Sequence, residues 1–165
     1  MTNINFVTSF NEDIYTVIGH HLINSIKNNW EPSIKITGYY HDFDPKNYSI
    51  KDINLKSLKD IKEYNNYLEV NKKHNGTEDN TIAYNWHLDS LKWSHKVFAL
   101  TEKAFELADE SKDAGWLIWI DADSLAKKRL VPDDILAMLP KECDVAYKGV
   151  RTYPDGTYYL DTSFI

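Results

Sequence analysis

The stretch Trp116-Leu117-Ile118-Trp119-Ile120-Asp121-Ala122-Asp123 decides the fold. Five apolar residues lead directly into two aspartates that are two positions apart. An unbroken apolar run of this length is typical of a strand that is buried on both faces of a parallel sheet. Because residues i and i+2 of an extended segment point to the same side, we expect Asp121 and Asp123 to converge. They would do so at the carboxyl edge of the sheet, where open α/β folds bind ligands.

This pair of carboxylates has two interpretations. Like charges that lie close together repel, so a divalent metal ion bridged to phosphate oxygens would explain both aspartates. Alternatively, either aspartate, and Asp123 more readily than Asp121, caps a helix or turn over residues 124–130 and has no role in binding. The apolar strand, the shared direction of the two acids and the long helix that precedes them favour the metal site.

The N-terminal part of the chain predicts a βαβ unit. Ile4–Phe10 is rich in β-formers, and Ser33–Tyr40 reads as a second strand. The helix between them has an apolar inner face that consists of Ile14, Val17, Ile18, His21, Leu22, Ser25 and Ile26. This order of elements predicts two parallel strands joined by a helix.

Further elements are expected to surround the same sheet. Residues 86–110 predict an amphipathic helix whose apolar stripe faces the core. The stripe consists of Leu91, Val97, Phe98, Leu100, Ala104, Phe105 and Ala108. A short helix is expected after Pro132, a strand over Cys143–Tyr147 and a hairpin over Arg151–Leu160, where Pro-Asp-Gly forms the turn. Residues 45–85 are rich in Lys, Asn and Asp, and the helical spacing of Leu55, Leu58, Ile61 and Leu68 predicts a short helix within a variable excursion.

Composition limits the class of protein. The 165 residues are 42% hydrophobic and 27% charged, which is typical of a soluble globular protein, and we take 1–165 as a single domain. A net charge of −6 argues against binding to nucleic acid. The single cysteine, Cys143, fits a reducing compartment, and no apolar window or signal peptide is evident, so a cytoplasmic protein without a membrane span is expected. Because the chain ends on the apolar Ile165, we expect it to be shorter than related proteins at its C-terminus.

The apolar strand followed by Asp121-Ala122-Asp123 resembles the DxD motif of nucleotide-sugar-dependent glycosyltransferases with the GT-A fold. The segments Phe6–Asn11, Ile34–Asp42 and Trp93–Lys96 resemble, in the expected order, the parts of this family that hold the nucleotide. The resemblance implies a Rossmann-like α/β fold with a mainly parallel central sheet flanked by helices. It also implies transfer of a sugar from a nucleotide-sugar donor to a glycan or another hydroxyl acceptor.

The resemblance assigns roles to individual residues. Mn²⁺ or Mg²⁺ would be held by Asp121 and Asp123. The other nucleotide-sugar contacts that it implies are Thr8, Ser9, Asn11, Tyr40, Asp42, Lys96, Asp121 and Ala122. In an inverting enzyme Asp161 would be the general base for the acceptor hydroxyl. Read from the residues alone, Asp42-Phe43-Asp44 predicts a turn with a side-chain-to-backbone hydrogen bond, and Lys96 an exposed helix lysine.

Two other functions fit the same motif. In a HAD-type phosphatase, Asp121 would be the phosphoryl nucleophile beside Mg²⁺, but that fold carries its motif near the start and needs a second acidic pair downstream. A degenerate GT-A domain would bind a nucleotide or glycan without turnover.

Overall fold

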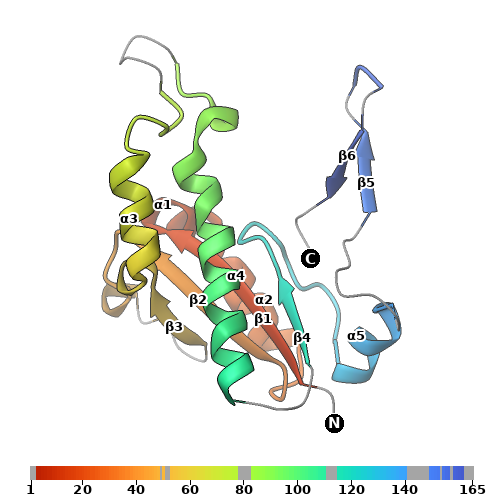
Figure 1. Cartoon of the computed structure of the whole chain (residues 1–165). Helices are drawn as coiled ribbons and strands as arrows, with labels where there is room; N and C mark the ends of the chain where they lie inside the picture. Colours follow the sequence, from red (N-terminus) through yellow and green to blue (C-terminus); the bar gives the residue numbers. More distant parts are fainter. Residues whose placement is uncertain are drawn as a thin grey trace.

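A four-stranded, all-parallel sheet forms the centre of the protein (Figure 1). The computed structural model describes residues 3–48, 50, 53–77, 83–110, 115–140, 149–152, 154–156 and 158–161. The strands, in their order across the sheet, are β3 (Asn54–Ser57), β2 (Lys35–His41), β1 (Ile4–Asn11) and β4 (Trp116–Trp119). The predicted α/β class and parallel sheet are therefore confirmed.

Helices cover both faces of this sheet. On one face lie α1 (Glu12–Ile14), a π-helical turn (Tyr15–Gly19) and α2 (His20–Asn29), which connect β1 to β2. On the other face, α4 (Ser90–Glu110) crosses the sheet beside α3 (Lys62–Val70), as Figure 1 shows. The predicted βαβ unit is confirmed, because β1 and β2 pair in parallel with Phe6 opposite Ile36. None of the described helices is long and apolar enough to cross a membrane.

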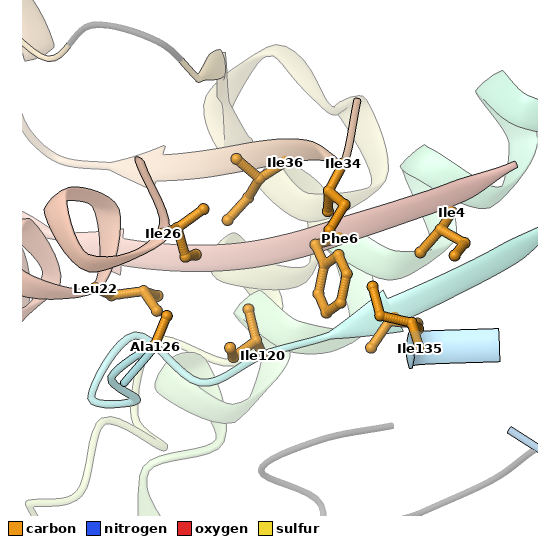
Figure 2. Close-up of a cluster of buried hydrophobic side chains, with 10 residues drawn as sticks. Ile4, Phe6, Leu22, Ile26, Ile34, Ile36, Ile120, Ala126 and Ile135 are labelled. Carbon is orange, nitrogen blue, oxygen red and sulfur yellow. The ribbon is translucent and has the colours of Figure 1, made fainter. Parts of the chain in front are cut away.

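Alternate residues of each strand supply two hydrophobic clusters, one on each face. On the α2 side, Phe6 lies at the centre of a cluster that includes Ile36 and Ile118 (Figure 2). On the α4 side, Val7 packs with Tyr39 and Trp119. Burial on both faces explains why β1 and β4 read as nearly continuous apolar runs.

The helix after β1 buries only part of the predicted face, in which Leu22 and Ile26 pack into the core as expected. His21 is exposed and Val17 is 74% exposed, whereas Tyr15 and Gly19 are buried. The cause is the π-helical turn Tyr15–Gly19, which fits one more residue into a turn and so rotates the residues before it relative to α2. A regular period of 3.6 residues therefore fails to predict this face.

Residues 45–85 contribute to the core, so their description as a variable excursion is incomplete. They include a strand that the sequence did not indicate, β3, which pairs in parallel with β2. Leu58 and Ile61, which were assigned to a helix, lie in a 3₁₀ turn and just before α3, and both are buried in the α4-side cluster. Only Leu68 of the apolar residues expected on that helix lies within α3.

Helix α4 is also rotated from its predicted orientation. Val97 is 60% exposed and Phe105 is 66% exposed, while Ser94, Ala99 and Lys103 are buried. Phe98 and Leu100 do pack against the core as expected. The buried side of α4 tolerates charge because its long side chains form ion pairs there.

A partly buried ion-pair network accounts for this charge. Lys103 lies 3.1 Å from Glu106, which also binds Lys56 at 2.6 Å. Burial alone would raise the pKa of Glu106, but hydrogen bonds from Lys56 and Lys103 outweigh it and lower that pKa. The aliphatic stems of lysines can pack against the sheet while their ammonium groups are paired.

The C-terminal part contains a short helix and a hairpin. Helix α5 (Pro132–Met138) begins at Pro132, as predicted. Strands β5 (Gly149–Thr152) and β6 (Tyr158–Asp161) form a separate antiparallel pair, which confirms the predicted hairpin. Gly156 adopts φ 87° in its turn, a left-handed conformation that suits glycine. The strand predicted over Cys143–Tyr147 lies outside the described residues.

Candidate functional site

A pocket lies at the topological switch point of the sheet. The strand order β3-β2-β1-β4 reverses direction between β1 and β4, and open α/β folds bind ligands at the carboxyl ends of the strands beside such a point. The pocket has a volume of about 360 Å³ and is lined by Ser9 from β1, the segment after β4 and the first turns of α4. The fold alone therefore predicts a binding site at the end of β4.

The backbone turns at the end of β4, in contrast to the extended geometry expected there. The strand itself ends at Trp119, and the N–H of Ser124 donates to the carbonyl oxygen of Asp121 at 3.0 Å. Ala122 is 7% exposed and packs into a cluster with Phe10. Asp121 and Asp123 nevertheless line the same pocket, on either side of this buried alanine.

The helix that was considered over residues 124–130 is absent, so Asp123 does not cap one. The segment is held to α2 by side chains instead. Asn29 donates from Nδ2 to the carbonyl oxygen of Ala126 at 2.8 Å, and the N–H of Ala126 donates to Ser25 Oγ at 2.9 Å. These bonds fix the position of the turn that carries the two aspartates.

Asp121 is the electrostatic centre of the pocket. Its Oδ1 lies 3.3 Å from Lys96 Nζ and accepts a hydrogen bond from the indole N–H of Trp119. The ammonium group of Lys96 also lies 5.0 Å from the centre of the Trp119 ring, within the range of a cation–π interaction. The side chain of Lys96 is only 16% exposed, so the prediction of an ordinary exposed helix lysine is wrong.

The structure brings together five of the residues that the resemblance selected. The pocket is lined by Ser9, Lys96, Asp121, Ala122 and Asp123. Their common location follows from the parallel pairing of β1 with β4 and from the crossing of α4 over both strands.

The other selected residues of β1 and β2 lie elsewhere. Thr8 is fully buried, and strand alternation places it with Phe6 on the opposite face; its hydroxyl has no hydrogen-bond partner among the described residues. Asn11 caps α1, because its Oδ1 accepts from the N–H of Ile14 at 2.9 Å. The ring of Tyr40 packs against Phe43, 5.5 Å away.

Asp42 belongs to a second polar cluster, at the end of β2. Its carboxylate binds both His41 Nε2 and Lys59 Nζ. Burial alone would raise the pKa of Asp42, but these two partners outweigh it and lower that pKa. His41 Nδ1 is 3.0 Å from the hydroxyl of Tyr64, so Nε2–H donates to Asp42 and Nδ1 accepts from Tyr64.

His95 connects the two polar regions. It lines the pocket, and its ring lies 5.1 Å from the ring of His41. Burial lowers the pKa of His95 to about 4, and the neighbouring His41 adds to this shift. His95 is therefore a neutral imidazole at pH 7.

Several lining residues were not selected from the sequence. Lys92 and Trp93 belong to the first turn of α4, and Ile14 and Ile18 belong to the helical segment after β1. Lys92 could have been found, because it lies four positions before Lys96 and so on the same side of the helix. Ile14 and Ile18 could not, because the π-helical turn decides where they point.

The donor set fits a hard divalent cation that shares its coordination with a ligand. Mg²⁺ is commonly bound by one or two carboxylates, with substrate phosphates and water as the remaining ligands. Asp121 and Asp123 supply two carboxylates on one pocket. Across the described ranges, no group of three or more His, Cys, Asp or Glu side chains could hold a metal ion. An ion held by the two carboxylates would take its remaining ligands from water and from oxygen atoms of a bound molecule.

Asp161, the predicted general base, lies at the end of β6, where its backbone pairs with Gly149. A second cavity, of about 630 Å³, lies at the amino ends of β1 and β2 and is lined by Asn3, Lys35 and Pro132 among others. It is larger, but it lies at the edge of the sheet opposite to the one where such folds bind ligands.

Comparison of the chain with known protein families, with curated proteins and with solved structures finds no match. The assignment of a function therefore depends on the chemistry of the pocket.

Proposed function

We propose that this chain is a GT-A-type, metal-dependent glycosyltransferase domain that moves a sugar from a nucleotide-sugar donor to a hydroxyl acceptor. The observation that supports it most is the pocket at the switch point, which combines two carboxylates from the turn after β4 with two lysines from α4. Carboxylates attract a divalent cation, and lysines attract phosphate. A nucleotide diphosphate bridged by a cation matches both halves of this lining.

Each charged residue has a role in this proposal. Asp121 and Asp123 would hold Mn²⁺ or Mg²⁺, which neutralises the charge of the leaving diphosphate when bound. Lys96 is held close to Asp121 and to the Trp119 ring, so its positive charge is placed before the donor binds. Lys92, on the same side of α4, adds a second cation.

The transfer itself exchanges two bonds at the anomeric carbon. The acceptor oxygen bonds to this carbon while the bond from the carbon to a phosphate oxygen breaks, and the diphosphate leaves with that electron pair. The acceptor hydroxyl loses its proton, which a carboxylate accepts in an inverting enzyme. Asp161 is the candidate for this base.

The proposal is tested by thermal unfolding in the presence of UDP-glucose, UDP-galactose, UDP-N-acetylglucosamine and GDP-mannose, each with and without Mn²⁺. A ligand that binds the folded state raises Tm. We expect at least one donor to raise Tm only when Mn²⁺ is present and the Asp123→Asn variant to lose this increase. Asp44→Asn is the matched control, because Asp44 also ends an Asp-x-Asp triplet but accepts a hydrogen bond from the N–H of Lys46.

Turnover is measured as metal-dependent release of nucleoside diphosphate. If no donor raises Tm in a metal-dependent manner, the glycosyltransferase proposal is wrong. Metal-dependent binding without release of nucleoside diphosphate would identify a non-catalytic binding domain instead.

A further inference from the structure

Two tryptophans, Trp86 and Trp93, form an exposed aromatic pair beside the pocket. Trp86 lies in the 3₁₀ turn Trp86–Leu88 that precedes α4, and Trp93 lies in the first turn of α4. Their ring centres are 5.6 Å apart, with the planes inclined by 53°. The two residues are 45% and 46% exposed. An exposed cluster of large aromatic side chains commonly marks a binding surface.

The two rings are held in place by the protein. Trp93 Nε1–H donates to the carbonyl oxygen of Trp86 at 2.9 Å, and the ring of His87 stacks on Trp86 at 3.5 Å. The N–H of Trp93 also donates to the carbonyl oxygen of Asp89 at 3.2 Å. Because the rings are already held in position, little side-chain conformational entropy is lost when a ligand stacks on them.

The tryptophan pair is continuous with the pocket. Trp93 lines the pocket together with Asp121, Asp123 and Lys96. Trp86 contacts Trp93 but is not among the residues that line the pocket. A ligand that begins in the pocket and continues outward would therefore meet Trp93 first and Trp86 second.

The surroundings of the pair favour an amphipathic ligand. Asp89 and Lys92 lie between the two tryptophans in the chain and add one charge of each sign to this segment. The Asp89 carboxylate accepts hydrogen bonds from the Tyr84 hydroxyl and from the N–H of Lys92, both at 2.9 Å. A pyranose ring presents C–H groups on its faces and hydroxyl groups around its edge, so it can pack on indole while its hydroxyls bond to such charges. An apolar helix of a protein partner would instead remove both charges from water and offer them no new hydrogen bonds, which is costly.

We propose that the tryptophan pair is a glycan-binding platform that holds an acceptor oligosaccharide so that its terminal hydroxyl reaches the pocket. This inference rests on the proposed function, because only a transferase requires an acceptor at this position. It adds that the acceptor is a carbohydrate and that α4 and the turn before it bind it.

The platform is tested by following the indole N–H signals of the five tryptophans by NMR. The probes are cello-, malto-, manno-, xylo- and chito-tetraose, and UMP and GMP serve as probes for nucleobase stacking, all without metal. We expect at least one tetrasaccharide to shift the signals of Trp86 and Trp93 and to leave those of Trp30 and Trp116, which do not line the pocket, unchanged. Trp86→Ala and Trp93→Ala should each weaken this binding by about tenfold, which corresponds to the loss of one aromatic contact.

Three controls keep the result specific. Trp93→Phe retains an aromatic ring and should restore part of the affinity, and circular dichroism checks that each variant is folded. Phe105→Ala, which removes a more exposed aromatic ring about 18 Å further along α4, should leave binding unchanged. Asp121→Asn should also leave tetrasaccharide binding unchanged, because it alters only the donor side.

The platform is disproved if no tetrasaccharide shifts these two signals, or if only UMP or GMP shifts them, which would assign the pair to the nucleobase. These results would leave metal-dependent donor binding intact. Conversely, if a tetrasaccharide binds but no nucleotide-sugar donor does, the glycan-binding platform is supported and the glycosyltransferase proposal is wrong.

Discussion

Asp42-Phe43-Asp44 and Asp121-Ala122-Asp123 share the same spacing and both follow a parallel strand at the carboxyl edge of the sheet. The middle residues of both triplets, Phe43 and Ala122, pack into the same cluster around Phe10. In both triplets the first aspartate is close to a lysine. The β2 corner (Asp42–Asp44) and the β4 corner (Asp121–Asp123) thus share their place after a strand, a middle residue that packs into the core and a lysine near the first aspartate.

The two corners differ in what surrounds the carboxylates. In the β2 corner, Asp42 already binds His41 and Lys59, and Asp44 accepts a backbone hydrogen bond that closes a turn. In the β4 corner, both aspartates line a pocket that also contains lysines. An Asp-x-Asp triplet therefore becomes a candidate site through the pocket next to it, and neither its spacing nor a neighbouring lysine is sufficient.

The largest expected effect comes from breaking the support of the β2 corner. Leu58 is fully buried beside Tyr39 and Tyr64, and its neighbour Lys59 binds Asp42. Leu58→Ala leaves a cavity and should lower the free energy of unfolding by about 3 kcal/mol, as measured by urea denaturation. Leu125→Ala, at a position that is 53% exposed, should change it by less than about 0.5 kcal/mol. Equal effects of the two substitutions would contradict the packing described for Leu58.

The lysines of the two corners should differ in donor binding. Lys96→Met removes a charge that faces the pocket, whereas Lys59→Met removes one at the β2 corner. The first should weaken Mn²⁺-dependent binding of a nucleotide sugar by about 20-fold, in line with the loss of one charged hydrogen bond. The second should leave the Kd, measured by calorimetry, unchanged. If the Kd rises for Lys59→Met and not for Lys96→Met, the donor binds at the β2 corner instead.

Acid should destabilise the protein through the imidazole that links the corners. The pKa of His95 is about 4 in the folded state, because burial disfavours the imidazolium, and about 6.5 in an unfolded chain. The unfolded state therefore binds more protons between these values, so stability present at pH 7 is lost as the pH falls. From pH 7 to pH 5 the loss should be about 2 kcal/mol.

Urea midpoints at pH 7, 6 and 5 measure this loss. His95→Gln should reduce the change of the urea midpoint with pH. A smaller change should remain because burial also lowers the pKa of His41. His74→Gln, at an exposed position, should retain the full slope. An unchanged slope in His95→Gln would show that another group carries the acid sensitivity.

The smallest effect is expected at Asp42, where two contributions oppose each other. Asp42 adopts φ 59°, a left-handed conformation that costs about 1 kcal/mol for a residue other than glycine. Its carboxylate is 55% exposed, so the ion pair with Lys59 stabilises the folded state by at most about 1 kcal/mol. Asp42→Gly should therefore change the free energy of unfolding by less than about 1 kcal/mol, with no change in donor affinity. A large loss of donor affinity would restore the nucleotide-binding role that the resemblance implies for Asp42.

The sequence predicted the parallel sheet and the position of the β4 corner because both depend on strongly apolar strands. Phe6 and Ile118, for instance, are buried on one face while Val7 and Trp119 are buried on the other. Strands that are apolar on both sides must be covered on both faces, as in a parallel sheet between layers of helices. The convergence of Ser9, Lys96 and the two aspartates follows from this arrangement.

The remaining features depend on tertiary contacts that override local patterns. Strand β3 has only one large apolar residue, Leu55, and is a strand because β2 offers it a free edge. Helix α4 buries Lys103 because its ammonium group pairs with Glu106, which also binds Lys56, and no periodicity of apolar residues reveals such a pair. In the sequence, Trp93 is one of several apolar residues of the helix. Only the packing of α4 on the sheet shows that it lines the pocket.

The π-helical turn at Tyr15–Gly19 has a consequence for the history of the chain. It accommodates one residue more than an α-helical turn while Leu22 and Ile26 remain seated on the sheet. A single-codon insertion or deletion between Asn11 and Leu22 could thus be absorbed by winding or unwinding this turn. When homologous sequences are aligned with this one, a one-residue gap is to be expected inside the helix at this position and not in a surface loop.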